Sequence, residues 1–339
     1  MAILKKIYYL LFCCALSGCY TDFYPDIESS PVLCMNSLLT ADESIDVELS
    51  RTWLYTDEAG AENNSVSDAS VSITVNGHSA VDDYIPAEGD CVRLKASSAK
   101  YGTAEAEVVV PLKVNVTGVQ FKPNITDVSF YEFEGVSYGY VMFDYMLDIT
   151  IADSSYDIDF FHYSCKGVDN NVSDFLESET GLNINIGTLK YEAEPVFGEH
   201  IDAFDSVMGA DAYGFTYFTD RSFQGKSYTL HLVYSNASVH FASANGNIEN
   251  QLNFELEITM DAVSESIYKY ALWQWQWYSG FLGDMGDIGL ADPLWGYSNV
   301  TTGAGVVGAK TSRKFIIDLR EMLYEALQNV EMPELSPLM

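Results

Sequence analysis

Residues 69–77, ASVSITVNG, alternate polar or small side chains with larger apolar ones and end in an Asn-Gly pair. Alternation with a period of two is typical of a β-strand, and Asn-Gly is the strongest two-residue signal for a tight hairpin. Comparable strand-like runs at short spacing surround this stretch, at 31–40, 44–55, 91–96 and 104–110, with a polar loop at 57–68. We therefore predict an immunoglobulin-like β-sandwich over residues 31–112.

Beyond this region the strand-like runs become longer and richer in aromatic residues. They lie at 138–151, 160–165, 215–218, 228–234 and 252–260. One helix is predicted after Ser264, an N-cap residue followed by Glu265 in the first turn. The prediction is a mainly β protein: the N-terminal immunoglobulin-like β-sandwich is followed by a larger antiparallel β domain over 114–315 with one or two short helices.

A helical C-terminal tail is predicted over 316–339. Its helix spans 318–328, and five of its residues form one apolar face: Leu319, Met322, Leu323, Ala326 and Leu327. Such a face is typical of a helix packed on the domain that carries it, which we favour over a partner-binding helix.

The composition restricts the class of partner. The 339 residues include 17 Lys and Arg against 49 Asp and Glu, giving a formal net charge of -32. A field of that sign repels a phosphate backbone, so we expect no nucleic-acid partner. Hydrophobic residues make up 48% of the chain, which is enough for a sizeable core in two domains.

The N-terminus has the pattern of a lipoprotein signal peptide. Lys5 and Lys6 precede an apolar run at 7–16, and Leu16-Ser17-Gly18-Cys19 matches a lipobox. We predict a signal peptide over 1–18, lipidation of Cys19 and a tether over 19–30. Because no later stretch reaches the roughly 20 apolar residues of a membrane-spanning helix, the lipid is the expected anchor. Whether the protein faces the periplasm or the cell surface stays open.

Three cysteines remain after the signal peptide and the acylated Cys19. Cys34 and Cys91 both lie in strand-like runs of the first domain and could form a disulfide, whereas Cys165 has no evident partner. Buried free thiols explain all three equally well. No Cys/His spacing indicates zinc.

Two groups of side chains are candidates for binding. Asp153, Asp157 and Asp159 form the tightest acidic group in a predicted turn and could bind calcium, although a solvated acidic loop is the commoner outcome. We predict no other cofactor.

Trp273, Trp275 and Trp277 alternate with glutamines, as on one face of a strand or of an extended helix end. They could stack on a sugar or enter a partner's groove, and core packing is the alternative.

Two glycine motifs suggest chemistry that their surroundings do not support. Residues 303–308, GAGVVG, match a dinucleotide-binding fingerprint but lack the strand and helix that it requires, so close backbone packing is the better explanation. Residues 135–139, GVSYG, match a nucleophile elbow around Ser137, but the residues that follow are β-like, which favours a hairpin.

Several segments in order resemble a family of Bacteroidota lipoproteins called domain of unknown function 4249. After the lipobox they are VLCMNSLLT at 32–40, DASV at 68–71 with the Asn76-Gly77 turn, FTD at 218–220, FQGK at 223–226, SESIYKY at 264–270 and YSNVTTGAGVVGA at 297–309. Ser37 stands where the family usually has glycine. The resemblance implies an outer-membrane lipoprotein that accompanies TonB-dependent transporters, and it supplies no catalytic residues.

These observations favour a non-enzymatic accessory or ligand-capture component of a TonB-dependent outer-membrane uptake system. The alternative is a structural or adhesive cell-surface lipoprotein. A hydrolase that uses Ser137 or an acidic pair comes third, because it needs a base oriented near a nucleophile in a pocket.

Overall fold

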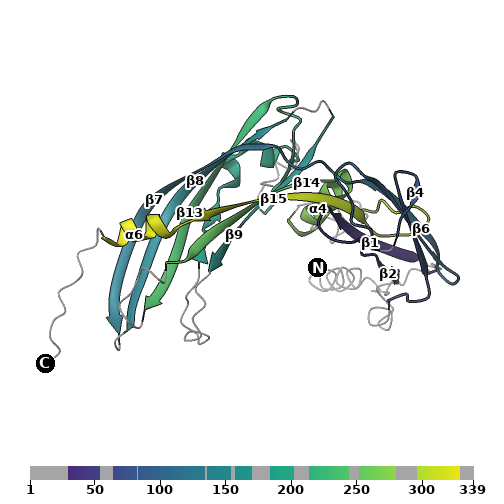
Figure 1. Cartoon of the computed structure of the whole chain (residues 1–339), viewed down its shortest axis with the longest axis horizontal. Coiled ribbons are helices and arrows are strands. Elements are labelled where there is room, and N and C mark those ends of the chain that lie inside the picture. Colours follow the sequence, from purple (N-terminus) through teal and green to yellow (C-terminus); the bar gives the residue numbers. More distant parts are fainter. Residues whose placement is uncertain are drawn as a thin grey trace, which may run out of the picture.

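The structure, a computed structural model, describes residues 30–53, 64–81, 83–133, 136–153, 157–169, 184–201, 214–243, 252–279 and 296–328. These residues are mainly strands, arranged in a smaller and a larger lobe along the long axis of the molecule (Figure 1). The predicted mainly β fold class is confirmed. The signal peptide, Cys19 and nearly all of the predicted tether lie outside the described residues.

The smaller lobe is a sandwich of two sheets. One sheet has the order β4-β3-β5-β6, and β1 and β2 belong to the facing sheet. The strands are β1 (Leu33–Thr40), β2 (Glu48–Arg51), β3 (Ser70–Val75), β4 (His78–Ser79), β5 (Cys91–Ser98) and β6 (Gly102–Val109). The predicted hairpin joins β3 to β4, and both of its turn residues, Asn76 and Gly77, have the positive φ angles (50° and 81°) of a type I′ turn.

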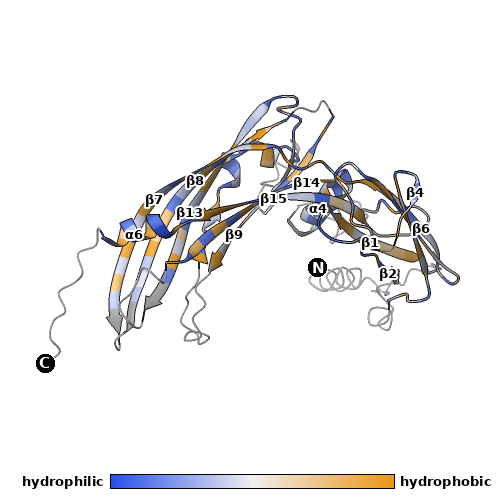
Figure 2. Ribbon diagram, in the orientation of Figure 1, coloured by the Kyte–Doolittle hydropathy of each residue, from blue (hydrophilic) through white to orange (hydrophobic). Residues whose placement is uncertain are grey.

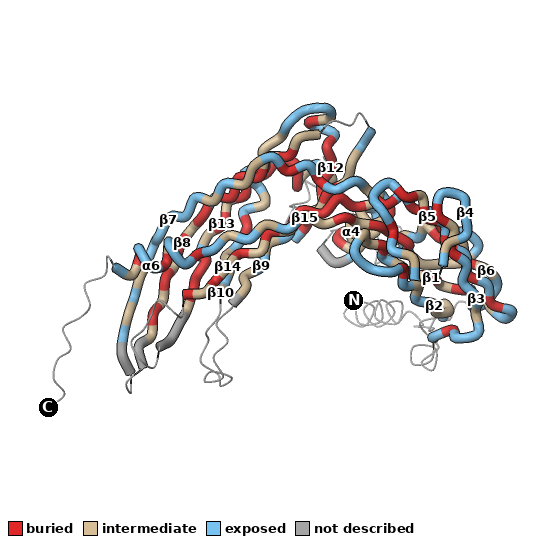
Figure 3. Tube along the Cα trace, in the orientation of Figure 1, coloured by how far each residue is buried: buried red, intermediate tan, exposed pale blue. Residues whose placement is uncertain are grey.

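The larger lobe is a second sandwich. Its five-stranded sheet contains β7 (Val116–Phe133), β8 (Val136–Ala152), β10 (Ile184–Asn185), β11 (Thr188–Leu189) and β13 (Ser227–Ser243). Facing it are β9 (Phe160–Asp169), β12 (Tyr217–Thr219), β14 (Phe254–Val263) and β15 (Val307–Asp318). Alternate residues of these strands are apolar and form one buried core between the sheets (Figures 2 and 3).

Strand β15 belongs to both lobes. Its first residues pair in parallel with residues 37–40 of β1, and residues 310–318 pair antiparallel with β14. Val307 and Ala309 lie in the core of the smaller lobe, whereas the side chains of Phe315 and Ile317 pack against that of the larger lobe. The smaller sandwich therefore includes residues from the far end of the chain, which the predicted range of 31–112 does not contain.

Strand β15 also extends past residue 315, where the sequence predicted that the larger β domain ends and the helical tail begins. Hydrogen-bonded pairing with β14 continues to Asp318, which lies opposite Glu255, so the tail begins as strand. Helix α6 (Arg320–Gln328) starts two residues later. Leu319, Leu323 and Ala326 are buried in the larger core, and Met322 and Leu327 pack against it. The predicted packing of this helix on its own domain is confirmed.

Helix α4 (Glu265–Ser279) begins directly after Ser264, as predicted. It packs on β9, β12 and β15 near the junction of the lobes (Figure 1). Two short 3-10 helices, η1 (Tyr191–Ala193) and η2 (Pro195–Gly198), follow β11. No helix in the described part of the chain is long and apolar enough to cross a bilayer.

The glycine motifs have structural explanations. Residues 303–306 pass between β1 and β6 before the chain enters β15, and a Cβ at Gly303 would collide with the carbonyl oxygen of Leu33. Ser137 lies in β8, one residue after the β7–β8 hairpin in which Phe133 pairs with Val136. Neither motif opens a helix, as its chemistry would require.

Cys34, Cys91 and Cys165 are free thiols, each half-buried. Of the two alternatives left open by the sequence, the structure therefore shows free thiols and no bridge between Cys34 and Cys91.

Candidate functional site

A cleft of about 780 Å³ lies where the two lobes meet. The smaller lobe contributes Gly89 and the end of β6, and residues 110–115 of the connection also line the cleft. The larger lobe contributes the end of β8, the start of β9, and the junction of β14 with α4. Clefts between domains are among the preferred places for ligand sites, so this cleft is the first candidate.

Apolar side chains are exposed along this cleft. Leu112 is 70% exposed, Val109 54% and Ile158 40%, and all three line it. Tyr297 and Asn299 add polar groups from the segment before β15. Neighbouring exposed apolar side chains in a concave surface are typical of a binding or docking site.

Acidic residues form one wall of the cleft. Asp153 follows β8 and Asp159 precedes β9, and both line the cleft. Asp220, which follows β12, brings a carboxylate oxygen within 4.8 Å of one from each of these two residues. The tight group is therefore Asp153, Asp159 and Asp220, whereas the sequence had suggested Asp153, Asp157 and Asp159. Asp157 is exposed and lies outside this group of three.

The three tryptophans do not form one surface. They lie on α4, where side chains four residues apart share a face and those two apart do not. Trp273 and Trp277 accordingly pack together with ring centroids 6.3 Å apart, and Trp277 is 44% exposed. Trp275 is buried, with its ring 4.4 Å from and perpendicular to that of His200. None of the three tryptophans lines the interlobe cleft, which α4 reaches only with its first turn.

His200, the contact of Trp275, is a neutral imidazole at neutral pH. Burial lowers the pKa of His200 to about 4, because the aromatic surroundings disfavour the charged form. Phe215 packs on the same histidine with ring centroids 4.3 Å apart. Trp275, His200 and Phe215 therefore pack together in the protein interior, which is the alternative to a binding role that the sequence left open for the tryptophans.

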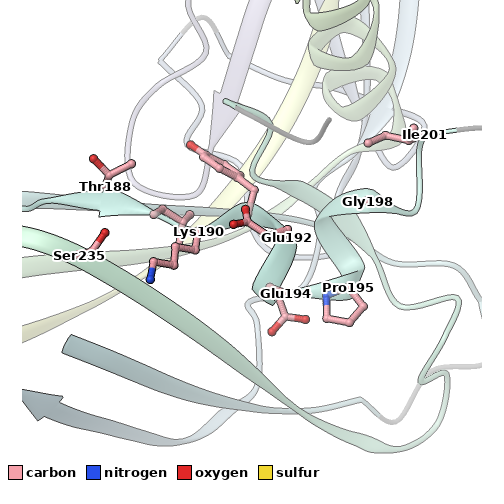
Figure 4. A pocket seen from close by; sticks show the side chains of 10 residues that line it. Thr188, Lys190, Glu192, Glu194, Pro195, Gly198, Ile201 and Ser235 are labelled. Atoms are coloured by element: carbon pink, nitrogen blue, oxygen red, sulfur yellow. The ribbon is translucent and has the colours of Figure 1, made fainter. Parts of the chain in front are cut away.

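A second cavity, of about 530 Å³, lies beside the 3-10 helices (Figure 4). Lys190 and Glu192 line it together with Glu194, which is buried. The Glu194 carboxylate accepts hydrogen bonds of 2.6 Å from the Tyr228 hydroxyl and from the backbone N–H of His231. Its two oxygens therefore already have partners that fasten this turn to β13.

Three polar side chains on the neighbouring strands β9, β14 and β15 resemble a hydrolytic triad, but they are hydrogen-bonded in a different order. The buried Asp261 lies between His162, 3.0 Å away at Nδ1, and Ser312, whose hydroxyl donates to it at 2.5 Å. A hydrolytic triad needs the histidine between the serine and the acid. Burial alone would raise the pKa of Asp261, but its hydrogen bonds with His162 and Ser312 outweigh burial and hold that pKa below its ordinary value.

Asp220 is the residue of this region that the motif search missed, because it is 61 residues from Asp159 in the sequence. The signal that could have found Asp220 is its position: it lies two residues after the strand-like run at 215–218 and directly follows β12, just as Asp153 directly follows β8. Carboxylates at the ends of neighbouring strands are candidates for one site.

Comparison with known families gives one match. The family described as "Domain of unknown function (DUF4249)" matches residues 20–316, most of the chain. Comparison with curated proteins found no match, and comparison with solved structures found none either.

Proposed function

The chain belongs to the DUF4249 family, and from this membership, the lipobox and the interlobe cleft we propose that it is a lipid-anchored accessory protein of a TonB-dependent outer-membrane uptake system. In this proposal Cys19 carries the lipid and the protein has no catalytic role. The cleft captures a ligand or docks on the transporter.

The cleft is the observation that carries the proposal. It joins exposed apolar side chains to polar groups on a β scaffold, which is the composition of a binding site. In the part of the chain that the structure describes, the group around Asp261 resembles a catalytic triad, but its acid, rather than its histidine, lies in the middle. Two sandwiches that share strand β15, held off the membrane by a tether, suit capture at a transporter mouth.

The lipid anchor is tested by metabolic labelling with an alkyne analogue of palmitate. The wild-type chain is expected to take up the label, and Cys19→Ala is expected to lose it, because the thioether to the lipid needs the thiol at this position. Cys34→Ala serves as the matched control and should label like wild type. Equal labelling of Cys19→Ala would contradict the lipoprotein assignment.

Partnership is tested by purifying the tagged protein from its native outer membrane in mild detergent and identifying what accompanies it by mass spectrometry. We expect a TonB-dependent barrel in stoichiometric amount. Leu112→Asp, which places a charge on the exposed apolar surface of the cleft, should reduce recovery of the barrel at least about tenfold.

Val81→Asp is the control for the partnership experiment. Val81 is 65% exposed on the same lobe but does not line the cleft. Equal recovery of the barrel with Leu112→Asp and Val81→Asp would show that the cleft is not the docking surface. Recovery of the lipoprotein alone, without a barrel, would instead favour the adhesive role.

A further inference from the structure

Three carboxylates converge at the end of the larger lobe that faces the smaller one. Asp153 comes from the five-stranded sheet, at the end of β8, whereas Asp159 and Asp220 flank β9 and β12 in the facing sheet. One carboxylate oxygen of each lies within 4.8 Å of the others. Two oxygens that each lie about 2.4 Å from one Ca²⁺ ion are at most about 4.8 Å apart, and the three carboxylates meet this limit.

The backbone holds these carboxylates in place. The Asp159 N–H donates to Oδ1 of Asp220 at 3.0 Å, and the Asp220 N–H donates to the carbonyl oxygen of Asp159 at 3.3 Å. On the other side, the Gly225 N–H donates to Oδ2 of Asp153 at 2.5 Å, and the Asp153 N–H donates to the carbonyl oxygen of Lys226. The turn between β12 and β13 therefore positions the group from both sheets.

Asp220 supplies the second, independent observation. It is fully buried, at 0% exposed, and its Oδ2 accepts no hydrogen bond from any residue that the structure describes. A buried carboxylate oxygen without a partner is costly, and such oxygens in native proteins usually have a bound water or ion. The charges that act on Asp220 here, those of Asp153 and Asp159, are negative and increase the cost.

Repulsion among the three carboxylates is also reflected in the pKa values of Asp220 and Asp159. Burial, with the repulsion of Asp153 and Asp159, raises the pKa of Asp220 to about 6. Burial and the charges of Asp153 and Asp157 also raise the pKa of Asp159. A divalent cation removes this conflict because it replaces repulsion between the carboxylates with attraction to each of them.

We propose that Asp153, Asp159 and Asp220 bind a divalent cation, and that the cation is Ca²⁺. Carboxylate oxygens are the ligands that Ca²⁺ prefers, and its variable coordination of six to eight oxygens accommodates a partly solvated site at a cleft wall. The bound ion fastens the two sheets of the larger lobe at the junction. It also places a positive charge beside the cleft, which the half-buried Asp153 and Asp159 line.

The test uses the full-length protein purified in detergent and stripped of metal with EGTA. Isothermal titration calorimetry with CaCl₂ is expected to show one site. At Ca²⁺ a hundredfold above the dissociation constant, the melting temperature should rise by roughly 5 °C. MgCl₂ should bind at least about tenfold more weakly, because Mg²⁺ demands a near-octahedral site and dehydrates reluctantly.

Two variants each remove the negative charge of one ligand without changing side-chain shape. Asp220→Asn and Asp159→Asn should each weaken Ca²⁺ binding at least about tenfold and abolish the rise in melting temperature. Asp157→Asn is the matched control, since it removes the same charge from the same turn but lies outside the group, and it should keep binding within about threefold. The second ligand variant decides the matter if the first does not fold.

Two results would overturn the proposal: no heat of binding and no change in melting temperature with Ca²⁺, or unchanged binding in both ligand variants. Because the measurement needs neither lipid nor transporter, its outcome is independent of the proposed role in uptake. Absence of a co-purifying barrel would leave the cation site standing, and absence of Ca²⁺ binding would leave the uptake role standing.

Discussion

Residues 30–112, expressed without the rest of the chain, are expected to remain unfolded. In the full chain, β1 has β2 on one side and β15 on the other, so the fragment exposes one complete edge of β1. It also loses Val300, Val307 and Ala309 from the core. A sandwich of this size has little stability to spare, because a small domain buries only part of its apolar surface.

Edge closure is the second reason for this expectation. Thr301 exchanges backbone hydrogen bonds with Glu105 of β6, at 2.7 and 3.1 Å, and Ala304 does the same with β1 through Leu33 and Met35. This late segment therefore ties the two sheets of the smaller lobe together. Circular dichroism and amide dispersion in NMR spectra of the fragment, compared with the full chain, measure the effect. A dispersed spectrum with a cooperative unfolding transition would show that the 30–112 fragment folds autonomously.

A matched pair of substitutions tests the shared strand within the full chain. Val307→Asp buries a charge in the core of the smaller lobe, where Val307 is 0% exposed, and should lower the free energy of unfolding by about 4 kcal/mol or more. Val109→Asp makes the same chemical change at a position that is 54% exposed and should cost less than about 1 kcal/mol. Equal losses in urea denaturation would contradict the assignment of β15 to this core.

Gly305→Ala is expected to destabilise the protein severely. Gly305 has a φ of +114°, in a region that residues with side chains rarely adopt. A Cβ there would also overlap the carbonyl of Met35, a backbone group that cannot move without breaking the hydrogen bonds of β1. Strain and overlap together should lower the free energy of unfolding by about 3 kcal/mol or more, measured by urea denaturation.

Gly77→Ala separates the two causes. Gly77 also has a positive φ, +81°, but a Cβ there meets nothing within 4 Å. It should therefore cost only the conformational strain, about 1 to 2 kcal/mol. If Gly77→Ala and Gly305→Ala lower the free energy of unfolding equally, then overlap with the Met35 carbonyl contributes nothing. Close packing would then not explain why residue 305 is a glycine.

Local signals predicted much of the fold. The Asn76-Gly77 pair predicted a hairpin because few residues tolerate two successive positive φ angles, and both angles are present. Ser264 and Glu265 predicted the start of α4 because serine is preferred at the N-cap and glutamate in the first turn, although the Ser264 hydroxyl accepts from the Ala309 N–H of β15. The apolar face from Leu319 to Leu327 predicted the packing of α6. Each of these signals lies within about ten residues of the structure it specifies.

The candidate site was only partly predictable. Asp153 and Asp159 are close in sequence and were identified, but Asp220 joins them through pairing of β9 with β12, which no local pattern records. The alternation of Trp273, Trp275 and Trp277 fitted a strand as well as a helix end. Helix α4 places Trp275 in the core and leaves Trp277 exposed, so the three tryptophans do not lie on one face.

The sequence by itself determined the mainly β class, the hairpin, helices α4 and α6 and the family, because these depend on short-range periodicity, turn chemistry and motifs in order. Only the tertiary structure decided that β15 completes the smaller sandwich, that the lobes enclose a cleft, and that Asp220 joins the acidic group. These three features depend on contacts between residues far apart in the chain. Such contacts form because buried strands need partners on both edges, and a residue's own neighbours do not specify which strand provides them.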